Sequence, residues 1–164
     1  MRISSRGINS MDSNLNELYR DILMDHYKYP RGKKTLDNPD LENQGQNPLC
    51  GDSLTVQVKI SDSVIEDVGV SCVGCAICTA SSSMLADIIK GKTLDEVKEI
   101  ARVVKHLLKG DDFESDLDLG DLEALEGVKK FPVRIKCALL SWTTLIDSIE
   151  SWEKGAELKV ISTE

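Results

Sequence analysis

Apolar and polar positions along the 164-residue chain change their period several times, and each change marks an expected element. Between residues 14 and 29, apolar side chains recur every three or four positions, which predicts an amphipathic helix ending before Pro30. The stretch 31–49 is rich in Gly, Pro, Asn and Asp and is expected to be a loop. Residues 53–60 and 64–72 alternate apolar and polar positions, which predicts two half-buried strands joined as an antiparallel hairpin.

Helical spacing returns after the hairpin. Apolar positions over 76–89 predict a helix closed by Gly91. Thr93 followed by Glu96 is a capping-box signature, and it opens a further helix that is expected to end near residue 109.

The last third of the chain begins with an acidic, weakly patterned segment. Residues 111–127 are expected to form an exposed insertion with a short helical turn near 122–125. Pro132 suits the first position of a long helix over 132–149. This order of elements predicts an α+β fold in which helices pack on one face of a small antiparallel β-sheet.

Length and composition indicate one globular domain. With 41% hydrophobic and 29% charged residues, the chain can bury a core of its own. We expect a disordered tail or leader at 1–10, a single domain over 11–155 and a C-terminal tail at 156–164. No apolar run reaches the roughly 18–20 residues that span a bilayer, and the start lacks the apolar centre of a signal peptide, so a cytoplasmic protein without membrane contact is expected.

The net charge of −8 is concentrated in one segment. Eight of the 28 acidic residues lie within 111–126, which contains no Lys or Arg, so the other 20 acids balance the 20 bases. A sequence pI near 4.8 argues against nucleic-acid binding, which requires a basic face.

Five cysteines carry the candidate chemistry. An odd number of cysteines in a chain without an export signal favours metal binding or sulfur chemistry over disulfides. Cys50 and Asp52 flank a glycine where the loop enters a strand, Cys75 lies where a strand gives way to a helix, and Cys137 lies in the first turns of the last helix close to Arg134. Three thiolates and one carboxylate suit either tetrahedral zinc or an iron-sulfur cluster.

Three separated motifs extend this reading. They are Asn47-Pro48-Leu49-Cys50-Gly51-Asp52, Gly74-Cys75-Ala76-Ile77 followed by Ala80-Ser81-Ser82-Ser83-Met84, and Ala124-Leu125-Glu126-Gly127-Val128 followed by Phe131-Pro132-Val133-Arg134-Ile135-Lys136-Cys137. Together with Asp25-His26-Tyr27 and Pro30, they resemble the U-type iron-sulfur cluster assembly proteins, IscU and its SufU branch. Lys136, where the IscU branch usually has His, and the acidic insertion make the chain more similar to the SufU branch.

The resemblance implies a SufE/IscU-like scaffold fold with Cys50, Asp52, Cys75 and Cys137 as the ligand set. It also implies a PLP-dependent cysteine desulfurase as partner, and iron-sulfur assembly proteins or apo-proteins as recipients. In the sulfur-carrier interpretation the ligands hold zinc, Cys50 accepts persulfide sulfur, and Arg134 gives electrostatic support. In the scaffold interpretation the same residues build a transient 2Fe-2S or 4Fe-4S cluster that Asp52 keeps labile. In both interpretations the protein is a carrier that partner proteins load and unload, rather than a stand-alone enzyme.

A structural zinc-binding adaptor is the alternative from a different class. An Asp ligand, flanking glycines and a neighbouring Arg argue against it, because closed structural zinc sites favour Cys and His. The two histidines are not assigned as ligands, and His26 is expected to pack or hydrogen-bond between the first helix and its neighbours.

Cys72 and Cys78 depart from the family pattern, which usually has Gly and Ser there. With Cys75 they spell Cys-x-x-Cys-x-x-Cys, as at the start of a ferredoxin cluster run, but no fourth Cys followed by Pro lies nearby. Cys72 continues the face of Val68 and Val70 and is interpreted as a small core residue. Cys78, one helical turn after Cys75, is a candidate substitute ligand or oxidation partner.

Overall fold

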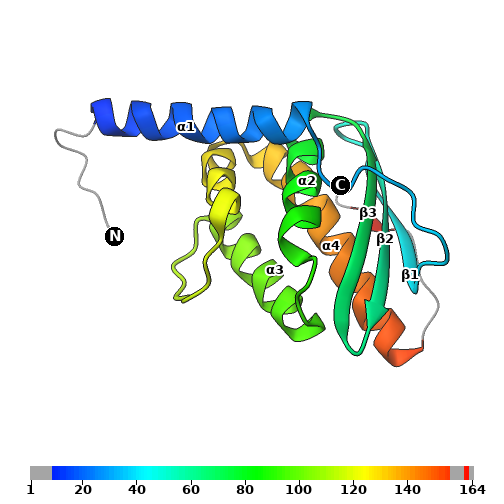
Figure 1. The fold of residues 1–164 in the computed structure, drawn as a ribbon. Helices are drawn as coiled ribbons and strands as arrows, with labels where there is room; N and C mark the ends of the chain where they lie inside the picture. Colours follow the sequence, from blue (N-terminus) through cyan, green and yellow to red (C-terminus); the bar gives the residue numbers. More distant parts are fainter. Residues whose placement is uncertain (1–8, 156–160, 163–164) are drawn as a thin grey trace.

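The structure is a computed structural model that describes residues 9–155 and 161–162. Its elements are α1 (Asn9–Lys28), β1 (Leu41–Asn47), β2 (Asp52–Ser61), β3 (Val64–Val73), α2 (Ala76–Ile89), α3 (Leu94–Lys109), the 3-10 helix η1 (Gly120–Lys130), α4 (Pro132–Lys154) and β4 (Ile161–Ser162). The sheet has the order β3-β2-β1-β4, antiparallel except for the β1/β4 pair. The helices lie on one side of this sheet (Figure 1), which confirms the expected α+β class.

The elements with clear periodicity lie where the sequence predicts them. β2 and β3 form the antiparallel hairpin, and Asp62 and Ser63 in its turn have positive φ values of 51° and 64°. Thr93 and Glu96 make both hydrogen bonds of the capping box at the start of α3. Pro132 opens α4, which continues five residues beyond the predicted end at Ile149.

The prediction of an uninterrupted loop over 31–49 is wrong, because β1 occupies its second half. The inward-facing positions of β1 are Leu41, Asn43, Gly45 and Asn47, so only one of the four is a large apolar residue. The strand forms because its backbone pairs with β2 over the whole register from Leu41↔Val58 to Asn47↔Asp52. The backbone pairing with β2 therefore determines that this segment is a strand. The order of apolar and polar side chains does not reveal it.

Gly45 allows β1 to lie directly against α4. A Cβ at this position would collide with Thr144 Oγ1 and come within 3.1 Å of Leu140 Cδ1. We expect Gly45→Ala to lower the free energy of unfolding by about 1–3 kcal/mol, the usual cost of overpacking. Urea unfolding followed by circular dichroism checks this. Gly127→Ala is the matched control, because its Cβ would meet only Tyr19 at an ordinary 3.9 Å, and an equal loss in both variants would contradict the packing argument.

The acidic segment differs from the expected exposed insertion in its second part. Residues 111–118 have no regular structure and are mostly exposed, as expected. From Leu119 onward the chain is anchored in the core, because Leu122, Leu125 and Val128 of η1 are fully buried or nearly so. Charged residues lie between these apolar residues in the sequence, so the sequence did not reveal the buried face of η1.

The segments expected to be tails fall mostly outside the described residues. Within the described part, α1 already begins at Asn9, and Ile161 pairs with Gly45 at the edge of the sheet. Among the described residues, no helix is both long enough and apolar enough to cross a membrane.

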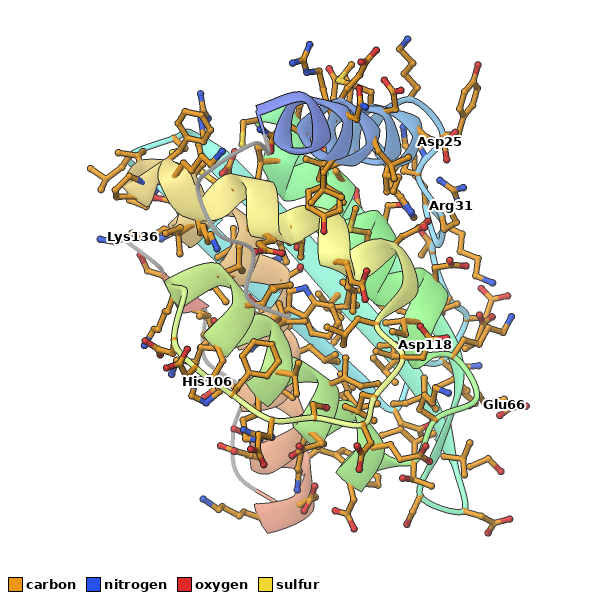
Figure 2. The ribbon with its side chains drawn as sticks, turned by 90° about the vertical axis from the view of Figure 1, so that its left-hand side faces the viewer. Asp25, Arg31, Glu66, His106, Asp118 and Lys136 are labelled. Atoms are coloured by element: carbon orange, nitrogen blue, oxygen red, sulfur yellow. The ribbon has the colours of Figure 1, made fainter. Side chains whose placement is uncertain are left out.

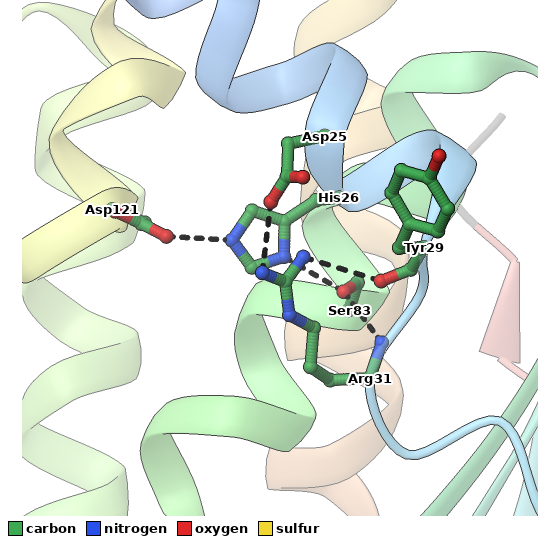
Figure 3. Close-up of polar contacts among 6 residues, drawn as sticks. All are labelled: Asp25, His26, Tyr29, Arg31, Ser83 and Asp121. Atoms are coloured by element: carbon green, nitrogen blue, oxygen red, sulfur yellow. Dashed lines mark hydrogen bonds and ion pairs between the residues drawn. The ribbon is translucent and has the colours of Figure 1, made fainter.

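His26 ties three elements together, which confirms its expected role (Figure 3). The ring is fully buried, with Nδ1 2.7 Å from Ser83 Oγ of α2 and Nε2 2.8 Å from Asp121 Oδ2 of η1. The backbone N–H of Arg31 also donates to Ser83 Oγ at 2.8 Å. Because Ser83 is only 1% exposed, this serine, histidine and aspartate arrangement is a structural link, inaccessible to a substrate.

Candidate metal centre

Cys50 and Asp52 lie on the tight turn that joins β1 to β2. The N–H of Cys50 donates to the carbonyl oxygen of Asn47 at 3.2 Å, and Gly51 follows with a φ of +70°, which glycine adopts without steric cost. Asp52 then begins β2 as the cross-strand partner of Asn47. Cys50 is half-buried and Asp52 is almost fully buried. The turn thus supplies an accessible thiol and a protected carboxylate two residues apart.

Cys75 reaches the same place from the junction of β3 and α2. It is the N-cap residue of α2, and its Sγ accepts the N–H of Cys78 at 3.5 Å. Its own N–H donates to Asp52 Oδ1 at 2.7 Å, and its Sγ lies 3.7 Å from Asp52 Oδ2. The helix N-terminus favours negative charge on both groups. Gly74 permits this approach, because its Cα has no room for a side chain beside Asp52.

Cys137 completes the group from the second turn of α4. Its side chain is fully buried, and its Sγ accepts a hydrogen bond from Asn47 Nδ2 at 3.7 Å. Burial, together with hydrogen bonds to Cys50 and Asp52, raises the pKa of the Cys137 thiol well above its usual range. Asn47 is a supporting residue that the sequence reasoning did not single out. Its position beside Pro48-Leu49-Cys50 in the first motif was the available signal.

Arg134 places a positive charge over the thiols from the first turn of α4. Its side chain is exposed, and its pKa is raised by the charge of Cys75 and by a hydrogen bond to Cys137. The guanidinium therefore lies close enough to interact with both sulfurs, and its role in electrostatic support remains a prediction.

The ligand atoms of Cys50, Asp52 and Cys137 all lie within 4.8 Å of one another. Cys75 joins this set through its two contacts with Asp52. Three sulfurs and one carboxylate oxygen from three separate chain segments match the tetrahedral donor set of zinc, so the residues present fit that metal. They also fit an iron-sulfur cluster with one oxygen ligand.

Cys72 and Cys78 do not join this group. Among the described residues, the clusters that could hold a metal do not include a set made of Cys72, Cys75 and Cys78, so the ferredoxin-like reading has no support in the fold. Cys72 packs partly buried against the core, as interpreted from its strand face, and Cys78 is fully buried beside it.

The fold and this site define a small α+β domain that presents a cysteine- and aspartate-lined candidate metal centre at one end of its sheet. Residues 18–138 match the model of the NifU-like N-terminal domain, and the chain belongs to this family. The kinship expected from the three sequence motifs is therefore confirmed.

Three comparisons show how similar the relatives are. The zinc-dependent sulfurtransferase SufU of Bacillus subtilis (strain 168) is 40% identical over 146 residues, covering 89% of this chain and 99% of the relative. The iron-sulfur cluster assembly scaffold protein IscU of Streptococcus pyogenes serotype M1 is 39% identical, covering 84% and 86%. The crystal structure of a putative SUF-system scaffold protein from Fervidobacterium islandicum superposes with a TM-score of 0.73 at 32% identity, covering 79% of this chain and 95% of that one.

Proposed function

We propose that this protein accepts persulfide sulfur from a PLP-dependent cysteine desulfurase through a zinc site formed by Cys50, Asp52, Cys75 and Cys137, and passes it on for iron-sulfur cluster assembly. The observation that carries the proposal is the convergence of Cys50, Asp52 and Cys137 within 4.8 Å, with Cys75 bonded to Asp52. The 40% identity to a zinc-dependent sulfurtransferase supports the choice of zinc and of sulfur transfer.

The four ligands differ in a way that suits one of them to reaction. Bound zinc would stabilise the three thiolates and protect them from oxidation until a partner docks. Cys137 is held in the core by α4, and Cys75 is fixed as the N-cap of α2. Cys50 lies on a turn next to Gly51 and is half-exposed, so it can leave the group with the smallest rearrangement.

The transfer step is an exchange between the Cys50 thiolate and the persulfide of the desulfurase. The Cys50 thiolate attacks the terminal sulfur of the desulfurase persulfide, a bond forms between the two sulfurs, and the bond inside the desulfurase persulfide breaks. The desulfurase cysteine leaves as a thiolate, and the proton of the terminal sulfur stays with the new persulfide on Cys50. Arg134, whose guanidinium interacts with Cys75 and Cys137, would stabilise the persulfide anion that forms once this proton is lost to solvent.

Exposed apolar side chains lie next to the candidate site residues in the sequence and support docking of a partner protein. Leu49, Val73, Phe131 and Val133 are 68%, 73%, 58% and 59% exposed, and each lies within four residues of a candidate ligand or of Arg134. A surface of this kind around a reactive group is typical of a protein interface. It supports sulfur transfer within a complex.

The test measures cysteine desulfurase turnover with and without the zinc-loaded protein, followed by mass spectrometry of this chain. We expect faster turnover and one extra sulfur atom on Cys50. A zinc-loaded protein that leaves turnover unchanged and gains no sulfur would identify the site as a structural zinc centre and overturn the proposal.

A second candidate function is that of a scaffold for a transient iron-sulfur cluster. The 39% identity to an IscU scaffold protein favours it, and the same four residues would be the ligands. Anaerobic incubation with ferrous iron and sulfide tests it, because a cluster gives visible absorption that the Cys137→Ala variant should lack. Equal absorption from the variant and the wild type would remove this role from the site.

A further inference from the structure

Two cysteines outside the candidate metal centre lie in contact with each other. Cys72 lies near the end of β3 and Cys78 in the first turn of α2, and their Sγ atoms are 3.1 Å apart as free thiols. A disulfide has a sulfur–sulfur distance of about 2.05 Å, so closing this pair requires a shift of only about 1 Å. The two residues are therefore already arranged as a dithiol that can be oxidised.

The two thiols of this pair have different surroundings. Cys78 is fully buried, whereas Cys72 is half-buried and lines a cavity that opens to solvent. Hydrogen bonds from the Cys78 thiol and from the Thr79 hydroxyl, 3.8 Å away, hold the pKa of Cys72 below its usual range. Cys72 is thus the accessible thiol with the lowered pKa, and Cys78 is the buried thiol next to it.

The cavity beside Cys72 is basic. Its volume is about 330 Å³, and its charged lining residues are Lys28, Arg31 and Lys33, with no carboxylate among the described residues that line it. Arg31 is paired at the rim with Asp25, Nη2 to Oδ2 at 2.8 Å, and both lie at the same edge of the molecule (Figure 2). Two lysines beyond this pair leave the cavity with a net positive charge. The hydroxyl of Thr79, 3.8 Å from Cys72 Sγ, also lines this cavity.

We propose that Cys72 and Cys78 form a redox-active dithiol site, separate from the metal centre, whose substrate is an anionic low-molecular-weight disulfide bound in this basic cavity. The Cys72 thiolate attacks one sulfur of the disulfide, forming a mixed disulfide and releasing one thiolate. Cys78 then attacks the Cys72 sulfur and closes the intramolecular disulfide, and the second thiolate leaves with the proton of Cys78. Two protein thiols are oxidised, and one disulfide is reduced to two thiols.

The size and charge of the cavity determine the choice of substrate. A peptide-like disulfide with free carboxylates matches the two lysines that lie beyond the Arg31–Asp25 pair at this cavity of about 330 Å³, and a cationic disulfide of similar reactivity would be repelled. Oxidised glutathione and cystamine are therefore suitable probes, because they share the disulfide bond and carry opposite net charge.

The experiment treats the zinc-loaded protein with each probe and identifies the products by peptide mapping. We expect loss of two hydrogen atoms per chain, a Cys72–Cys78 cross-link, and reaction with oxidised glutathione about tenfold or more faster than with cystamine. The Lys28→Gln/Lys33→Gln double variant should lose this preference, while Lys105→Gln on α3 should keep it.

Two single variants separate the roles of the thiols. Cys78→Ala should stop at a stable glutathione adduct on Cys72, and Cys72→Ala should leave Cys78 unmodified, because Cys78 has no exposed surface. Cross-links that involve mainly Cys50, Cys75 or Cys137, or equal rates with the two probes in the wild type, would overturn the proposal. The position of the cross-link and the ratio of the two rates are both measured on the wild-type chain. They therefore test the proposal even if a variant fails to fold, and they do not depend on sulfur transfer by the metal centre.

Discussion

Cys50→Ala is expected to abolish sulfur transfer from a cysteine desulfurase to this protein. Cys50 is the candidate ligand that combines partial exposure with a position on a glycine-containing turn. Alanine cannot form the sulfur–sulfur bond, and the neighbouring thiols are held by packing or by helix capping. Desulfurase turnover should therefore fall to the level measured without the protein, a complete loss of stimulation rather than a partial one.

The control for this prediction is Cys72→Ala. Cys72 is also half-buried and lies close in sequence to Cys75, but it is not among the residues grouped at the metal centre. Its removal should leave stimulation by the protein intact. Equal stimulation by Cys50→Ala and the wild type would show that Cys50 does not accept the transferred sulfur, because a thiol that takes no part in the transfer can be removed without effect.

Gly74→Ala is expected to disrupt the metal centre without removing any ligand. The added Cβ would overlap Asp52 Oδ1 and lie 2.8 Å from Asp52 Cα, a backbone atom that cannot move without shifting β2. Asp52 would lose its contacts with the Cys75 N–H and Sγ. We expect zinc affinity to fall by about 10–100-fold, as for the loss of other interactions that orient ligands, together with about 1–3 kcal/mol of stability.

The affinity change is measured by competition with a zinc-binding dye, and the stability change by urea unfolding. Gly127→Ala serves again as the control, because it adds the same methyl group in a part of η1 with room for it. Wild-type zinc affinity in Gly74→Ala would show that the close approach of Gly74 to Asp52 is not needed by the centre.

The sequence predicted those parts of the fold that depend on local patterns. The β2/β3 hairpin, the Thr93/Glu96 capping box and the start of α4 at Pro132 follow from alternation and from residue-specific caps. It missed β1, because Asn43 and Gly45 occupy inward positions that depend on the neighbouring β2 and α4. The alternation of apolar and polar residues shows neither the backbone pairing of β1 with β2 nor its packing against α4, which is distant along the chain.

The same distinction holds for the metal centre. Cys50 and Asp52 are two residues apart, so their proximity could be predicted from the turn at Gly51. The arrival of Cys137 from α4 depends on how that helix packs against β1, and it was reached only through the family resemblance. Neither the local patterns nor the family resemblance predicted the 3.1 Å contact between Cys72 and Cys78. This contact depends on how the turn between β3 and α2 orients the end of the strand toward the start of the helix.

The zinc content of the protein purified in air tests the central claim most directly. The convergence of Cys50, Asp52, Cys75 and Cys137 predicts roughly one zinc ion per chain in the wild type. Cys137→Ala should lose most of this metal, and Cys72→Ala should keep it. A wild-type protein without zinc, or a Cys137→Ala variant with undiminished zinc, would contradict the assignment of these four residues as a metal centre.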